Sequence, residues 1–122
     1  MPEPSFQAPL PEFDPKALRS LRKLGGIKKI DELLGQFRAN SGVYLQTLKE
    51  LAPGGAEEAR GVLRRLQSSA ARLGALGLEE RCAALAAEIA SRRTLPPAGG
   101  LRELEDSVER AKQWLEKARK EV

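Results

Sequence analysis

Apolar residues recur at intervals of three and four along most of the chain, the spacing that places side chains on one face of an α-helix. Four long stripes follow this pattern, within residues 27–51, 56–73, 78–89 and 101–118. Clusters of glycine and proline separate the stripes, because glycine tolerates the conformation that ends helices and proline cannot continue one. The pattern therefore predicts four amphipathic helices.

A shorter helix is predicted ahead of these four. Asp14 can cap free backbone N–H groups, and Pro15 suits the first helical position, where no N–H is needed. Gly25-Gly26 is the predicted end of this short helix. Within the long helix that follows, Ser41-Gly42 weakens the helical preference and is a candidate bend.

Short connections between consecutive long helices favour antiparallel neighbours. We therefore expect an all-α fold, an antiparallel up-down four-helix bundle with the short N-terminal helix as a lid. Residues 1–12 hold four prolines among few large apolar side chains, a composition that predicts a disordered tail. The bundle is expected to span residues 13–122 as one domain, since 122 residues leave little room for a second core.

The residue inventory excludes most enzyme classes. The chain has no histidine and one cysteine, Cys82, so the usual zinc-ligand sets and histidine-dependent nucleophilic sites cannot be built. We expect no catalytic residue, no metal and no cofactor, and we therefore expect that the protein is not an enzyme.

Cys82 lies on an apolar stripe and is expected to be buried and inert. Trp114 is expected to lie in the core or at its edge. Without an apolar run long enough for a membrane span, or a signal peptide, a cytoplasmic protein is expected.

Residues 63–75 read LRRLQSSAARLGA. This segment resembles, in register and without gaps, the signature of histidine-phosphotransfer (HPt) domains, roughly A-H-x-L-K-G-S-A-x-x-L-G-A. The matching positions are Leu66, Ser69, Ala70, Leu73, Gly74 and Ala75. The order of the predicted helices matches as well, so the resemblance covers about residues 13 to 118 and implies the HPt-like bundle.

The departures from this signature fall at its reactive positions. The phospho-accepting histidine of the family falls on Arg64, its lysine on Gln67 and its glycine on Ser68. Arginine is protonated at any physiological pH and offers donors but no lone pair, so it cannot accept a phosphoryl group in this way. The resemblance implies a pseudo-phosphotransfer module of two-component or phosphorelay signalling. Such a module would dock the receiver domain of a response regulator, or a histidine kinase, without carrying phosphate.

The expected binding face lies on the helix of residues 56–73, around Arg64. Arg64 is expected to point outward into the acidic pocket of a receiver domain, with Leu63 supplying apolar contacts. An ordinary solvated arginine is the alternative for this position. The expected partner-binding residues are Arg60, Leu63, Arg64, Gln67, Ser68, Ala71 and Arg72.

A second cationic cluster offers an alternative function. No acidic residue interrupts it, so it could contact nucleic acid or an anionic membrane surface. Nucleic acid is not favoured, because no aromatic side chains are interleaved to stack on bases. A purely structural or dimerisation bundle is the third possibility, although a monomer is favoured. This basic cluster comprises Lys16, Arg19, Arg22, Lys23, Lys28 and Lys29.

Overall fold

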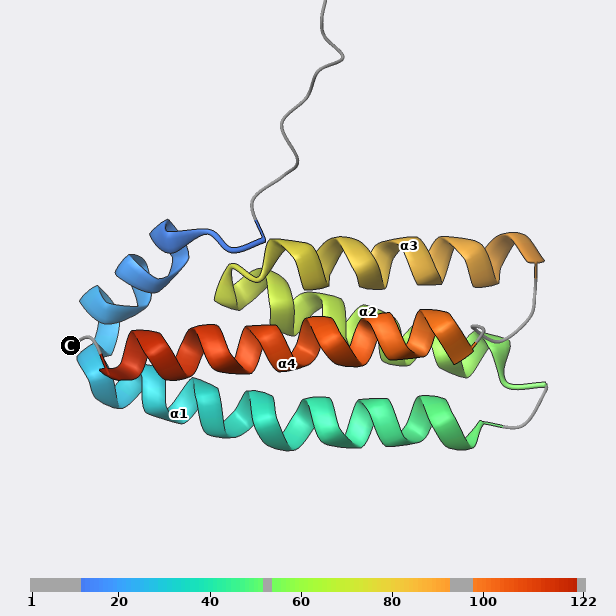
Figure 1. Ribbon diagram of the computed structural model, residues 1–122, viewed down its shortest axis with the longest axis horizontal. Coiled ribbons are helices and arrows are strands. Elements are labelled where there is room, and N and C mark those ends of the chain that lie inside the picture. Colours follow the sequence, from blue (N-terminus) through green and yellow to red (C-terminus); the bar gives the residue numbers. More distant parts are fainter. Residues whose placement is uncertain (1–11, 52–53, 93–97, 121–122) are drawn as a thin grey trace, which may run out of the picture.

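The computed structural model describes residues 12–51, 54–92 and 98–120, which form four helices. The helices are α1 (Pro15–Glu50), α2 (Ala56–Leu73), α3 (Leu76–Arg92) and α4 (Ala98–Lys120). They lie side by side along one long axis (Figure 1), and each packs against two others in the cyclic order α1, α2, α3, α4. The predicted all-α class and the up-down packing of four helices are thus confirmed in the described part of the chain.

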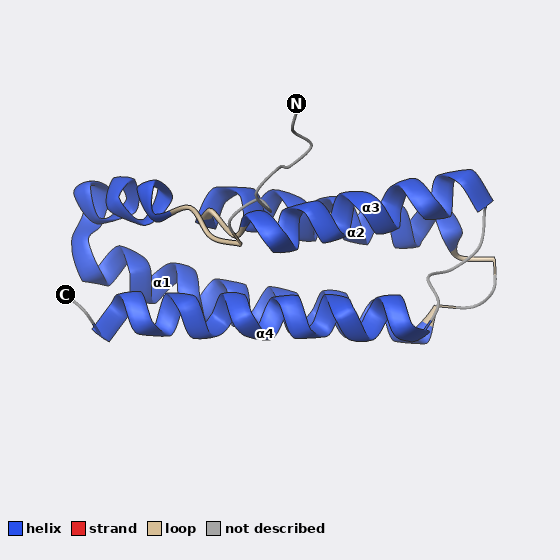
Figure 2. Ribbon diagram, turned by 45° about the horizontal axis from the view of Figure 1, so that its top comes forward, coloured by secondary structure: helices blue, strands red, loops and turns tan. Residues whose placement is uncertain are grey.

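A sharp bend at Gly26 divides α1. Gly26 has φ 65° and ψ −154° and is the only residue of α1 with non-helical dihedrals, a conformation that glycine adopts because it lacks a Cβ atom. The residues before the bend lie beyond the ends of α2 and α3, and the rest runs along the bundle (Figure 2). The predicted break at Gly25-Gly26 is therefore a bend within one helical element. The candidate bend at Ser41-Gly42 is wrong, since the helix continues through it.

The start of α1 is bonded to the turn between α2 and α3. The Asp14 side chain accepts a hydrogen bond from the Lys16 N–H at 3.0 Å, as the predicted helix start requires. The Asp14 N–H donates to the Gly74 carbonyl at 2.8 Å, and the Gly77 N–H donates to the Glu12 carbonyl at 2.9 Å. Glu12, which the sequence assigned to the tail, is thus part of the folded chain. The rest of the predicted tail lies outside the described residues.

All the predicted stripes contribute to one core. Cys82 is fully buried in it, and Trp114 packs at its edge with its ring stacked on Phe13 at a centroid distance of 4.5 Å. Leucine and isoleucine fill most of the centre, which is consistent with the low aromatic content. The largest fully buried side chains include Ile30, Leu63, Leu66, Leu78, Ile89, Leu104 and Leu115.

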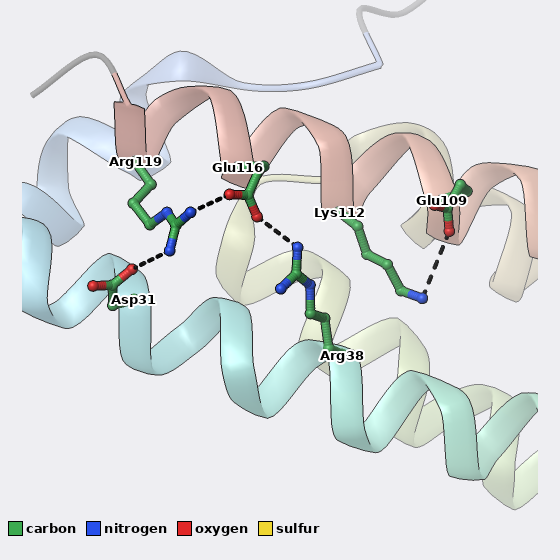
Figure 3. Close-up of polar contacts among 6 residues, drawn as sticks. All are labelled: Asp31, Arg38, Glu109, Lys112, Glu116 and Arg119. Carbon is green, nitrogen blue, oxygen red and sulfur yellow. Dashed lines mark hydrogen bonds and ion pairs between the residues drawn. The ribbon is translucent and has the colours of Figure 1, made fainter.

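Ion pairs join α1 to α4 on the surface (Figure 3). Arg38 contacts Glu116 at 2.5 Å, and Arg119 contacts Asp31 at 3.3 Å and also pairs with Glu116. Because these side chains are partly solvated, each pair stabilises the fold by about 1 kcal/mol or less.

No helix in the described part of the chain combines the length and the apolar character that crossing a bilayer requires.

Candidate partner-binding site

The candidate site lies on α2, which packs against α1 on one side and α3 on the other. Its remaining side is free of other elements in the described residues and carries the exposed positions of the segment that resembles the HPt signature. Glu57 and Glu58 lie in the first turn of α2 and Arg72 in the last. This charge order favours the helix, because the N-terminus of a helix is partly positive and its C-terminus partly negative.

Four of the predicted site residues are exposed on this side. They are Arg64, Ser68, Ala71 and Arg72. Arg65, which flanks them, is exposed as well. We call Arg64, Arg65 and Arg72 the arginine face. None of its three side chains forms a salt bridge within the described residues, so no neighbouring carboxylate neutralises this positive surface.

Leu63 is a correction to the predicted site. Its side chain is 0% exposed, because one residue step turns the helix by about 100° and carries Leu63 from the surface of Arg64 into the core. It cannot contact a partner of the folded bundle.

Arg60 and Gln67 are only half-exposed. The Arg60 side chain pairs with Glu57 at 2.6 Å and lines a cavity of about 310 Å³ beside Ile89 and Ala90 of α3. Its Nε atom is buried and has no hydrogen-bond partner in the described structure. Arg60 therefore belongs to the α2–α3 boundary, and the free cations of α2 lie on the arginine face.

The structure adds residues of α1 that the sequence analysis missed. A narrow groove of about 50 Å³ between α1 and α2 is lined by Gln36 and Asn40 on one side and by Ser69 and Arg72 on the other. Val43, 62% exposed, lies one helical turn beyond Asn40 and so on a neighbouring surface position. A local signal existed for Val43, because it is an apolar residue that falls outside the buried stripe of its helix.

The basic cluster does not form one continuous face, because the Gly26 bend divides it. Arg22 is half-buried and donates a hydrogen bond from Nη2 to the Ala118 carbonyl at 3.1 Å, which connects α1 to α4. The Lys29 Nζ atom lies 4.0 Å from Glu32 Oε1 and forms an ion pair with it. The remaining four cations of the cluster are exposed: Lys16, Arg19, Lys23 and Lys28.

Cys82 is confirmed as a buried thiol. Burial, with a further contribution from the nearby charge of Glu79, raises the pKa of Cys82 from 9.0 to about 12. The thiolate, which is the reactive form of cysteine, is therefore disfavoured at neutral pH. Within residues 12–51, 54–92 and 98–120, no group of three or more histidine, cysteine, aspartate or glutamate side chains could hold a metal ion.

The arginine face can bind anionic groups through planar, multiply donating guanidinium ions. Such groups pair with carboxylates or phosphates in a fixed geometry, and they offer no lone pair to a phosphoryl donor. The chemistry available at this face is therefore recognition of negative charge. Comparisons of the chain with protein-family models, with curated proteins and with solved structures found no match.

Proposed function

We propose that this chain is an HPt-like binding module that docks the receiver domain of a response regulator, or a histidine kinase, without accepting phosphate. One observation carries the proposal. Arg64, which takes the place of the histidine in the HPt signature, is exposed on the open side of α2 and has no acidic partner among the described residues. It presents a permanent cation where an active member of the family would present a nucleophile.

Charge complementarity supports a receiver domain as the partner. The resemblance implies that the partner surface is a cluster of carboxylates around a magnesium site. Arg64 would pair with one of these carboxylates, while Arg65 and Arg72 favour the correct orientation during association. Val43 and the groove beside Asn40 offer the apolar contact that Leu63 cannot supply.

The residue inventory supports docking without phosphotransfer. The chain contains no histidine, and its single thiol, Cys82, is buried in the core. Gln67 and Ser68 also replace the lysine and glycine that the family places beside its histidine. These substitutions alter the reactive surface, whereas the signature positions Leu66, Ala70 and Leu73 remain in the core.

The proposal also assigns the part of α1 before Gly26 to the N-terminal lid helix of the HPt-like fold. Leu18 and Leu21 in this segment are buried in the shared core. Phe13, just before the segment, stacks on Trp114 of α4, and the Arg22 hydrogen bond to Ala118 joins the segment to the end of α4. These contacts support the proposal that the segment acts as a lid over one end of the bundle.

A binding titration against a panel of isolated receiver domains tests this function. We expect at least one domain to bind, and Arg64→Glu to weaken that binding by about tenfold or more, because it places a carboxylate against the acidic pocket. The matched control is Lys28→Glu, which changes the net charge equally but lies on α1. We expect this control to retain the affinity of the unsubstituted chain within about threefold, the range of long-range electrostatic effects.

Two results would contradict receiver docking through α2. One is that no receiver domain binds the folded chain. The other is that Arg64→Glu and Lys28→Glu weaken binding equally, which would show that net charge governs the interaction and that the arginine face has no special role.

A further inference from the structure

A cavity of about 230 Å³ lies between the first turns of α1 and the last turns of α4. Three cations line it and no acidic side chain does, although the chain is rich in both kinds of charge. None of its residues belongs to α2, so it is separate from the arginine face. The lining residues are Pro15, Leu18, Arg19, Arg22, Trp114, Lys117 and Ala118.

The three cations of this α1–α4 cavity differ from other cations nearby. Arg110 and Arg119 are each paired with a carboxylate. Arg19, Arg22 and Lys117 form no salt bridge within the described ranges. Like charges that converge without a counter-charge repel one another, and a bound anion would relieve that repulsion.

Arg22 is held in place at the edge of this cavity. Its Nη2 atom donates to the Ala118 carbonyl at 3.1 Å, which holds the guanidinium at the edge of the cavity. Its Nε atom is buried and has no hydrogen-bond partner in the described structure. The Nη2 bond fixes the position of the guanidinium, so its remaining donors need not be ordered when a ligand binds.

Apolar groups form the rest of the cavity wall. The Trp114 ring is held by stacking on Phe13, with ring centroids 4.5 Å apart and planes inclined by 17°. Pro15 and Leu18 lie on the opposite element, α1. A ligand that combines a compact anion with a small organic group would therefore meet both cationic and apolar contacts.

We propose that the α1–α4 cavity binds a phosphate monoester. The dianion would lie among Arg19, Arg22 and Lys117, because guanidinium groups match phosphate oxygens in geometry and three cations suit a double negative charge. The organic group of the ester would lie against Trp114. The volume of about 230 Å³ accommodates the phosphate and the adjoining part of this group.

This ligand chemistry has two possible sources, a small soluble ester and the headgroup of phosphatidic acid in a membrane. Leu24 and Ile27, on either side of the Gly26 bend, are 77% and 42% exposed. Exposed apolar side chains among cations are suited to the interface of an anionic bilayer. The two sources are separated by the experiment below.

Trp114 makes the test direct, because it is the only tryptophan in the chain and lines the cavity. We expect phenyl phosphate at neutral pH to change its fluorescence saturably. Arg19→Gln with Lys117→Gln should raise the Kd by about tenfold or more, since each removes a charge-assisted contact. The control pair, Lys23→Gln with Lys28→Gln, removes the same charge outside the cavity and should leave the Kd within about twofold.

The charge of the ligand provides a further check. The second pKa of a phosphate monoester is about 6, so the affinity for phenyl phosphate should fall as the pH is lowered through this value. Phenyl sulfate remains a monoanion, so it should bind more weakly and show no such dependence.

Vesicles of phosphatidylcholine, with and without phosphatidic acid, distinguish the sources. A lipid source predicts binding only to vesicles with phosphatidic acid. It also predicts that Leu24→Ser with Ile27→Ser reduces vesicle binding and leaves the phenyl phosphate Kd unchanged. A soluble source predicts binding of phenyl phosphate but not of either kind of vesicle.

The proposal is overturned if phenyl phosphate gives no saturable change in Trp114 fluorescence, or if the cavity variants and the control variants lose affinity equally. Neither outcome bears on receiver docking, which uses α2.

Discussion

Leu63 and Arg64 are neighbours in the chain but have opposite environments in the fold. Leu63 is fully buried and Arg64 is exposed, as expected for adjacent residues on a helix whose two faces meet core and solvent. The outward position of Arg64 could be predicted, because it lies off the apolar stripe. The prediction that Leu63 contacts a partner is wrong, because its apolar side chain belongs to the buried stripe of α2 although it stands beside the reactive position of the signature.

The two residues should respond oppositely to truncation. We expect Leu63→Ala to lower the free energy of unfolding by about 2–5 kcal/mol, because it leaves a cavity in the core. Arg64→Ala should change it by about 0.5 kcal/mol or less, as is usual for an exposed side chain without partners. Urea denaturation followed by circular dichroism measures both. A large loss of stability in Arg64→Ala would show that Arg64 has a structural role.

Cys82 should be unreactive in the folded chain and should contribute a pH-dependent term to stability. Its folded pKa of about 12 lies above the ordinary value of 9.0, so its contribution is complete below pH 9. The contribution is lost as the pH rises from about 9 toward 12, because the unfolded state releases the thiol proton first. Thiol labelling at pH 8 with increasing urea measures accessibility, and Cys82→Ala isolates the pH term. Rapid labelling of the native chain would contradict the burial of this thiol.

At the scale of the helices, most helix ends could be predicted from capping residues and glycines near them in the sequence. Gly74 ends α2 with φ 78°, and a Cβ atom at this position would lie 2.6 Å from the Ala17 Cβ atom, so a glycine is required there. The prediction failed at Ser41-Gly42, since both residues keep helical dihedrals and Ser41 is buried in the bundle. Tertiary packing thus outweighs the weak helical preference of this pair. α4 also begins at Ala98, ahead of the predicted stripe of residues 101–118.

The ion pairs of Glu116 should contribute a small, salt-dependent part of the α1–α4 association. Glu116 pairs with both Arg38 and Arg119, so we expect Glu116→Gln to lower the free energy of unfolding by about 0.5–1 kcal/mol. Glu109→Gln is the control, because the one ion pair of Glu109 among the described residues is with Lys112 of its own helix, at 3.6 Å. Thermal unfolding at low and high salt tests this. An effect that persists unchanged at high salt would mean that packing, and not charge, is responsible.

At the scale of the whole molecule, periodicity predicted the architecture but could not predict the concave surfaces. Apolar stripes must be buried against one another, and four of them with short connections have few other arrangements. The groove beside Asn40 joins α1 to α2, and the α1–α4 cavity joins Arg19 to Lys117, almost a full chain length apart. No local pattern relates such residues. The cationic character of α2 could be predicted. The position of Gln36 and Asn40 beside Arg72 could not, because it depends on how α1 packs against α2.

The most direct test of an HPt-like docking face is to restore the missing chemistry. We expect the triple variant Arg64→His, Gln67→Lys and Ser68→Gly to take up radiolabel from a phosphorylated receiver domain that binds the unsubstituted chain, while the unsubstituted chain takes up none. Transfer needs the imidazole at the aspartyl phosphate in docking geometry, so it would place the α2 face against the receiver active site. Label on the unsubstituted chain, or none on a folded triple variant that still binds the receiver, would contradict this assignment.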